Sequence, residues 1–303
     1  MAKLFPFGQA GAWYRGNLHT HSSNSDGSRN PRDVCAFYRR RGYHFISLTD
    51  HFKPEYGYPV TDTRPYRRQG FTTIYGAELH APATSLGELW HVLAVGLPLD
   101  FAPPTSRERG PGLAARAADA GAYVAVAHPA WYDLTDRDVL SVGAADAIEI
   151  FNTTCDASNG KGDSLGYLDR MLSQNRHYHA IATDDAHFHA HRPDWGKNWV
   201  MVRARHLEPE ALMDALRAGA FYSSQGPEIA SVERIRGGVL RVSSSPVRTI
   251  RVTGASSGQS TVHASADISA ADLDLGAVRG TYARVTVINR RGNRAWSNPF
   301  PLD

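Results

Sequence analysis

The stretch Gly16-Asn17-Leu18-His19-Thr20-His21-Ser22-Ser23-Asn24-Ser25-Asp26-Gly27 is the starting point for interpreting this 303-residue chain. Alternate residues of an extended segment point to the same side, so His19 and His21 can direct both imidazoles into one cavity. Asp26 adds a carboxylate just before a glycine turn. Imidazole and carboxylate ligands together suit Zn, Mn or Fe. Because a single His-x-His pair can arise by chance, the interpretation depends on further ligands elsewhere in the chain.

The charge balance and the lengths of the apolar segments argue against several classes of protein. The chain contains 33 Lys and Arg against 30 Asp and Glu, and the basic residues are spread out, which argues against binding of long nucleic acid. The first residues lack the apolar core of a signal peptide, and no apolar run of about 18 residues occurs. We therefore expect a cytoplasmic protein without membrane association. Cys35 and Cys155 form no CxxC motif, so we expect two buried free thiols.

The first two thirds of the chain alternate between apolar strands and helices, and polar residues follow the strands. His51, Glu78, His128 and Asp185 each come at or just after the end of an apolar segment. The alternation predicts a parallel sheet covered on both faces, either a barrel or an open doubly wound sheet. The carboxyl ends of barrel strands converge on one rim, whereas an open sheet gathers ligands only near one switch point. Because several strands carry candidate ligands, we predict an α/β barrel.

The pattern changes at about residue 228. From there, short apolar segments are separated by Gly, Ser and Pro and show no helical period. We predict a barrel domain over residues 1–227 and a small, sandwich-like all-β accessory domain over residues 228–303. The second segment has no cluster of titratable residues, so we expect it to pack against the barrel or to mediate homo-oligomer formation.

Residues able to bind metal recur along the predicted barrel. Buried together without compensation, such imidazoles and carboxylates would cost on the order of several kcal/mol each, which predicts a multinuclear metal site. The nine candidate ligands are His19, His21, Asp26, His51, Glu78, His91, His128, Asp185 and His187.

These residues resemble, in order, the motifs of the polymerase and histidinol phosphatase (PHP) superfamily. The matching motifs span residues 16 to about 190. The resemblance implies a distorted (β/α)7 barrel that holds two or three divalent metal ions (Zn, Mn or Fe) in its C-terminal cleft. More loosely, residues 221–227 and 296–299 resemble the branch that contains the carbaryl-type carbamate hydrolase. The six motifs are His19-x-His21, Thr49-Asp50-His51, Glu78, His91, His128 and Asp185-x-His187.

The resemblance also implies how the ligands are shared. Asp26 stands where many members of the superfamily have His, and this form is similar to the branch with phosphodiesterases and nucleotide phosphatases. The change leaves the occupancy of a third metal site open. In the implied distribution, His19, His21, Glu78 and Asp185 hold one metal, Glu78 bridges to a second metal completed by His91 and His128, and Asp26, His51 and His187 hold the third.

A site of this kind predicts hydrolysis by a hydroxide that bridges two metal ions near Glu78. His187 and Asp50 are the candidate acids for protonating the leaving group. Polar residues in nearby loops could bind the substrate, cations because they pair with phosphate and Asn152 as a hydrogen-bond donor. The candidates for this role are Asn152, Lys161, Arg192, Arg64 and His189.

We expect a phosphoesterase that acts on a small phosphorylated molecule. The first alternative is a carboxylester or carbamate hydrolase that uses the same metal site, and the second is a non-catalytic metal-binding module. A phosphomonoesterase needs two or more cations facing the metals, whereas an ester hydrolase needs an apolar acyl pocket. The residues that line the cavity should therefore distinguish the two enzymes.

Overall fold

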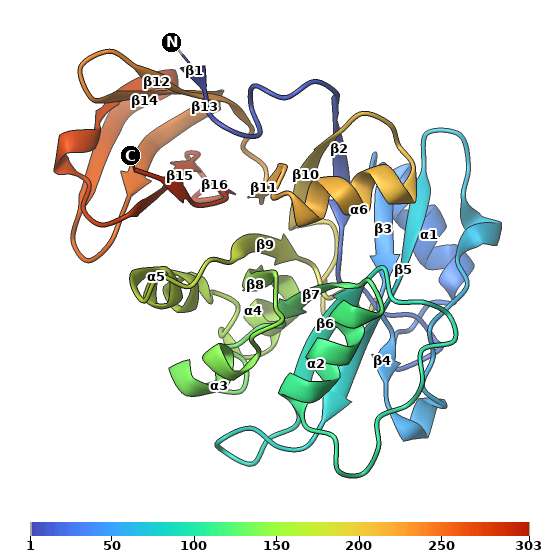
Figure 1. Cartoon of the computed structure of the whole chain (residues 1–303). Helices are drawn as coiled ribbons and strands as arrows, with labels where there is room; N and C mark the ends of the chain where they lie inside the picture. Colours follow the sequence, from blue (N-terminus) through green and yellow to red (C-terminus); the bar gives the residue numbers. More distant parts are fainter. Residues whose placement is uncertain (1, 303) are drawn as a thin grey trace.

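The computed structural model describes residues 2–302 and shows an α/β protein, which confirms the predicted class at that level (Figure 1). The helices are α1 (Pro31–Arg40), α2 (Gly110–Asp119), α3 (Asp136–Ser141), α4 (Thr153–Asn159), α5 (Leu165–Ser173) and α6 (Pro209–Arg217). The first strands are β1 (Ala2–Lys3), β2 (Ala12–Asn17), β3 (Phe45–Leu48), β4 (His51–Phe52), β5 (Thr72–Ala81), β6 (Trp90–Val95), β7 (Tyr123–Val126), β8 (Ala147–Asn152) and β9 (His179–Thr183). The remaining strands are β10 (Trp199–Ala204), β11 (Phe221–Ser224), β12 (Ile229–Ile235), β13 (Val239–Thr253), β14 (Gln259–Asp274), β15 (Tyr282–Ile288), β16 (Arg294–Ser297) and β17 (Phe300–Pro301).

The strands of the first two thirds pair in a series that returns to its beginning. β2 pairs with β3, β3 and β4 pair with β5, and the series continues through β6, β7 and β8 to β9. Just beyond β9, Ala186 forms a parallel bridge with Thr20, just beyond β2. The side chain of Ser223 in β11 bonds to the backbone of β9, accepting from Ala182 and donating to Ala180. The distorted seven-strand barrel itself stays a prediction.

The expectation of a wholly parallel sheet is wrong at two positions. β6 is antiparallel to both β5 and β7. β5 and β6 are joined by residues 82–89, which are too few for a parallel crossover, so the second strand must return antiparallel. β10, which the sequence reading did not identify, is antiparallel to β2 and β11.

Three candidate ligands lie at positions that differ from those expected relative to their strands. β2 ends at Asn17, so His19 and His21 lie in the extended segment that follows it. Hydrogen bonds to the backbone after β9 hold this segment, since the Asp185 amide donates to the His19 carbonyl and the His21 amide donates to the Ala186 carbonyl. Glu78 lies inside β5, not at its end, because β5 continues to Ala81.

Helix α1 follows directly from the segment that carries the first three candidate ligands. The Asn30 side chain caps its first turn by accepting from the Asp33 amide at 2.9 Å, and Pro31 begins the helix. Its buried face, which includes Val34 and Tyr38, packs against β3 residues such as Ile46. This packing fixes the start of α1 and therefore the end of the ligand-bearing segment.

The C-terminal residues form antiparallel strands with an apolar cluster of their own. β13 and β14 are long strands paired along most of their length, and β13 also pairs with β15. β16 pairs with β11, which joins these strands to the first part of the sheet. Trp296 and Tyr282 pack in the same apolar cluster as residues of β5 to β9. The domain boundary at residues 227 and 228 stays a prediction.

Two simpler expectations can be compared directly with the structure. Cys35 and Cys155 are both free and buried, which confirms the prediction for the thiols. Within residues 2–302, no helix combines the length and the apolar character needed to cross a membrane.

Candidate metal centre

The carboxylate of Glu78 lies at the centre of a group of imidazoles. Its side chain is 1% exposed, and those of the six histidines around it are between 0 and 19% exposed. The distances from its oxygens to the nearest ring nitrogens run from 2.5 to 3.7 Å. The six histidines are His19, His21, His51, His80, His91 and His128.

Asp185 faces the same volume from the segment after β9. Its Oδ1 atom lies 2.8 Å from Nε2 of His21 and 3.3 Å from Nε2 of His19. The segment between His21 and Gly27 folds back on itself, and a Cβ atom at Gly27 would lie 2.8 Å from the carbonyl carbon of His21. Glycine at this position therefore permits the turn that follows the two histidines.

A third group of ligands lies on the outer side of the centre. The two carboxylate oxygens of Asp26 are each 3.4 Å from an Nε2 atom, one of His51 and the other of His187. The Asp26 side chain is 40% exposed, unlike Glu78. His21 lies between the groups, with its ring centroid 4.2 Å from that of His187 and 4.3 Å from that of His51.

The donor atoms of these residues fit divalent metal ions. Nε2 of His19 and Oε2 of Glu78 are buried and make no well-aligned hydrogen bond among the described residues, although Nδ1 of His51 lies 2.5 Å from Oε2. Polar atoms left in this way are costly unless a further partner, here a cation, completes them. The structure brings together ligand atoms within 4.8 Å of one another in four groups, which share members. They are His19, His21 and Asp185; His19, Glu78 and His128; His51, Glu78 and His80; and His21, Asp26, His51 and His187.

The electrostatics of the group divide the histidines into two kinds. Burial lowers the pKa of His21 to about 3, and neighbouring His187 and His51 act in the same direction. Burial also opposes the charge on His51, but Glu78 and Asp26 outweigh it and raise the pKa of His51 to about 10. Although burial disfavours a charged carboxylate, the surrounding histidines hold the pKa of Glu78 well below its usual range. Without metal, protons on histidines such as His51 neutralise the negative charge of the carboxylates. Divalent metal ions would displace these protons when they bind.

Two of the ligand positions have a backbone conformation that side chains rarely adopt. His128 has φ 26° and Asp185 has φ 52°, both in the left-handed region. Such conformations cost on the order of 1–3 kcal/mol each and persist only where the surroundings impose them. In this backbone conformation the side chain of His128 points toward Glu78, and that of Asp185 points toward His19 and His21.

A second carboxylate, that of Glu149 in β8, contacts two of the candidate ligands on the side away from Glu78 and was not predicted from the sequence. Glu149 is fully buried and lies 3.0 Å from Nδ1 of His19, while it accepts from the His128 amide at 2.8 Å. Asn152 donates to Glu149 and to Asp185. Asn152, expected to bind substrate, is thus itself fully buried and engaged by two carboxylates. A charged residue inside the apolar segment of β8 was the signal for Glu149.

His80 is the other residue that sequence reasoning missed. It lies two positions after Glu78 in β5, on the same side of the strand, and its Nε2 atom is 2.9 Å from Nδ1 of His51. The alternation of side chains along a strand was the available signal.

A cavity of about 220 Å³ opens onto the centre. Of the residues expected to bind substrate, Arg192 and His189 line it. Trp131, Thr154 and Cys155 complete its wall beside the candidate ligands. Arg192 is the one guanidinium among these lining residues, and Trp131 supplies an apolar surface.

The remaining candidates lie away from this cavity. Arg64 pairs with Asp62 at 2.7 Å, and Lys161 pairs with Asp133 at 2.6 Å; neither lines the cavity. Asp50, considered as an acid, is buried and accepts from the hydroxyls of three residues and from one backbone amide. It holds the segment after His21 in place and does not line the cavity. His187, the other candidate acid, does line it.

Comparisons with known proteins show a shared fold. No family model and no curated protein matches the sequence. A two-domain protein from Bacteroides vulgatus that contains a predicted PHP-like metal-dependent phosphoesterase superimposes with a TM-score of 0.55 at 17% identity, over 95% of this chain and 94% of that one.

Two other solved structures are more distant. A candidate metal-dependent phosphoesterase from Bifidobacterium adolescentis gives a TM-score of 0.41 at 15% identity, and an amidohydrolase from Chromobacterium violaceum gives 0.43 at 15%. Each covers 57% of this chain and 87% of its own. The protein therefore shares the fold of the two-domain protein from Bacteroides vulgatus, and the candidate metal ligands of its sequence meet at one place in that fold.

Proposed function

We infer that the protein is a PHP-type metal-dependent hydrolase that cleaves a small phosphate ester. The observation that carries this proposal is the position of Glu78, whose carboxylate is buried among six imidazole rings, with ring nitrogens at 2.5 to 3.7 Å from its two oxygens. Together with Asp185, this donor set matches two adjacent divalent cations held by a shared carboxylate. The closed series of strands around the centre supports the distorted seven-strand barrel as its scaffold.

The residues of the chain have separate tasks in this reaction. When bound, divalent ions such as Zn, Mn or Fe supply positive charge that polarises a phosphoryl oxygen and lowers the pKa of water. His19, His21, Glu78, His91, His128 and Asp185 would hold two such ions, and Asp26, His51 and His187 a third. Arg192 lines the cavity; its Nε atom lies 3.3 Å from Asp194 and its Nη1 atom donates to Ser158, so Nη2, which makes no hydrogen bond among the described residues, is the atom that can pair with a phosphate oxygen.

The lining of the cavity favours a singly charged substrate. Among its described lining residues Arg192 is the one guanidinium and no lysine is present. A phosphomonoester carries about two charges at neutral pH, whereas a diester carries one, so one guanidinium matches the diester better. Trp131 provides a face for an apolar leaving group. The same pair of features favours a carboxylester or carbamate hydrolase as the second candidate function.

Metal analysis combined with a substrate panel tests the proposal. Purified protein is analysed by ICP-MS for Zn, Mn and Fe and assayed with bis-p-nitrophenyl phosphate, p-nitrophenyl phosphate, p-nitrophenyl acetate and 1-naphthyl methylcarbamate. We expect bound metal and fastest turnover of the phosphodiester, both lost in Glu78→Gln. Glu88→Gln, at an exposed position between β5 and β6, is the matched control and should behave as the parent.

Each result of this panel has a defined meaning. Preference for the acetate or the carbamate would replace the phosphoesterase with the second candidate function. Absence of metal and of metal-dependent turnover on all four substrates would refute the enzyme altogether.

A further inference from the structure

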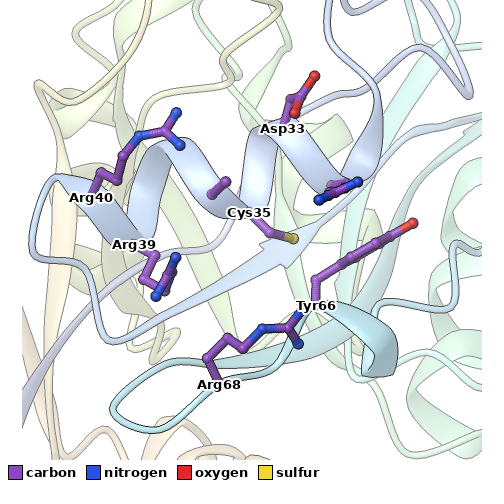
Figure 2. Close-up of a pocket in the computed structure, with 8 residues that line it drawn as sticks. Asp33, Cys35, Arg39, Arg40, Tyr66 and Arg68 are labelled. Carbon is purple, nitrogen blue, oxygen red and sulfur yellow. The ribbon is translucent and has the colours of Figure 1, made fainter.

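A second hollow, of about 380 Å³, lies between α1 and the segment of residues 64–68 (Figure 2). None of its lining residues lines the cavity of the metal centre. It is larger than that cavity, and its wall is rich in guanidinium groups. The residues that matter here are Arg32, Cys35, Arg39, Tyr66 and Arg68.

The cations of this basic hollow come from two different elements. Figure 2 shows Arg39 on the side of α1 that faces Tyr66 and Arg68, and the sulfur of Cys35 points to the same side. Asp33 and Arg40 point to the opposite side of the helix in this view. The acidic side chain of the wall is thus turned away from the guanidiniums.

These guanidiniums lack acidic partners within the protein. Among residues 2–302, no carboxylate oxygen lies within 4.0 Å of a side-chain nitrogen of Arg32, Arg39 or Arg68. The single nearby carboxylate, that of Asp33, already accepts from the Asn30 amide group at 2.9 Å. By contrast, Arg241, Arg248, Arg284 and Arg294 in the C-terminal part each have a carboxylate partner within 2.8 Å.

Arg68 is held in place by its own loop. Its Nη1 atom donates to the carbonyl oxygens of Pro65 and Arg67, at 2.8 and 2.6 Å. The loop is closed by paired backbone hydrogen bonds between Arg68 and Phe71, each 2.9 Å long. A fixed guanidinium with a free second edge loses little conformational entropy when it binds an anion.

The helix dipole does not account for this arrangement. Arg39 lies in the last turn of α1, where a cation is favoured, but Arg32 lies in the first turn, where it is disfavoured. Arg68 belongs to no helix. Beneath them, the Cys35 thiol forms a neutral floor, because burial raises the pKa of this thiol to about 12. The charged residues that line the hollow are thus arginines, apart from Asp33, whose side chain points to the opposite side of α1.

We propose that the basic hollow binds a small molecule bearing a diphosphate group. Three guanidiniums match the charge of a diphosphate, and each can form paired hydrogen bonds with phosphate oxygens. The volume lies in the range of small-ligand sites. The ligand is either free pyrophosphate or a nucleoside diphosphate, whose base would lie against the half-buried Tyr66. The proposal does not depend on the function of the metal centre.

Isothermal titration calorimetry of the purified protein with pyrophosphate, ADP and inorganic phosphate tests this site. We expect pyrophosphate or ADP to bind, to bind more tightly than phosphate, and to weaken as salt is added. Arg39→Ser combined with Arg68→Ser should lower the affinity about 10-fold or more. The matched control is Arg290→Ser combined with Arg291→Ser, which removes two exposed charges in the C-terminal part and should leave the affinity unchanged.

Tighter binding of ADP than of pyrophosphate would identify a nucleotide site, and equal binding would identify the diphosphate itself as the ligand. Equal loss of affinity in both double variants would mean that the anion senses only net charge, which overturns the proposal. Binding that survives Arg39→Ser and Arg68→Ser would place the anion elsewhere, such as at the metal centre, and also overturns it. So would the absence of binding by either diphosphate.

Discussion

The Nδ1 atom of His19 lies 3.0 Å from Oε1 of Glu149, while the Nε2 atom of the same ring lies 3.7 Å from Glu78. The imidazole is thus held between a carboxylate at the centre and one behind it. A carboxylate behind a histidine ligand fixes its tautomer and orientation and makes it a stronger donor. Sequence reasoning identified the ligand but not the residue that orients it.

Glu149→Gln should weaken metal binding without unfolding the protein. Glutamine keeps the size of the side chain but removes the charge that orients His19. We expect a loss of about 10–100-fold in metal affinity, measured by competition with a chromophoric chelator. Circular dichroism should show that the fold is kept, and Glu88→Gln is the surface control. Unchanged affinity in a folded Glu149→Gln variant would show that His19 needs no orienting carboxylate.

Asp26→Ala should affect the outer group of ligands alone. Asp26 contacts His51 and His187, whereas Glu78 and Asp185 make the inner contacts. We expect the variant to lose at most one metal equivalent by ICP-MS and to keep the tightly bound remainder. Asp26→His, which introduces the residue found in many PHP proteins, should restore the lost equivalent. Loss of all metal from Asp26→Ala would contradict the division into inner and outer groups.

Arg192 and Arg64 provide a matched pair for substrate binding. Arg192 lines the cavity, while Arg64 is exposed and paired with Asp62 outside it. Arg192→Ala should raise KM for the preferred phosphate ester about 10-fold, since a hydrogen bond between charged groups contributes on the order of 1.5–3 kcal/mol. Arg64→Ala should leave both kinetic constants unchanged. Steady-state kinetics on the two variants decide the matter, and a larger effect at Arg64 would reverse the assignment.

The grouping of the candidate ligands could be predicted in part because most of them follow a simple rule. Residues at or just beyond the carboxyl ends of neighbouring strands meet in space, as His51, His128 and Asp185 do. Glu78 lies inside β5 and His91 lies near the start of antiparallel β6, so these two reach the centre by strand pairing and not by this rule. Glu149 and His80 also lie inside strands, and no motif pointed to them. Their positions depend on the alternation of β5 and β8, which determines the face each side chain occupies.

The contacts of the candidate substrate-binding residues could not be predicted in the same way. The direction of the Arg64 guanidinium depends on Asp62, and that of Asn152 on buried Glu149 and Asp185, which are brought near by folding. Strand direction was partly accessible, since the short connection 82–89 already excludes a parallel crossover between β5 and β6. β10 was missed although its residues alternate between half-buried and buried, the pattern that indicates a strand.

His179 predicts a pH dependence of stability that is separate from the metal centre. Burial against Tyr123 and Phe221 lowers the pKa of His179 from 6.5 to about 4. The unfolded chain therefore binds the proton first, so this contribution is complete above about pH 6.5 and is lost as the pH falls to about 4. We expect a loss of up to about 3 kcal/mol across that interval.

Urea unfolding of the parent and of His179→Gln between pH 4 and 7 measures this contribution. The variant should lose less stability on acidification than the parent, and His206→Gln, at an exposed position, should follow the parent. NMR titration of the His179 ring gives an independent value. A midpoint near 6.5 in the folded protein would contradict the prediction.

Asn298 joins the C-terminal strands to the first part of the sheet. Its Oδ1 atom accepts from the Ala180 amide at 2.8 Å, and its Nδ2 atom donates to the carbonyls of Gly219 and Phe221. Asn298→Ala leaves all three partners unsatisfied and should lower the free energy of unfolding by about 2–4 kcal/mol, measured in urea. Gln69→Ala, on the exposed loop before β5, should change it little. Because Asn298 holds the backbone of β9 and β11, a truncation after residue 228 removes these hydrogen bonds and should also destabilise the first part of the chain. A stable, active truncated protein, together with unchanged stability of Asn298→Ala, would show that the two regions fold independently.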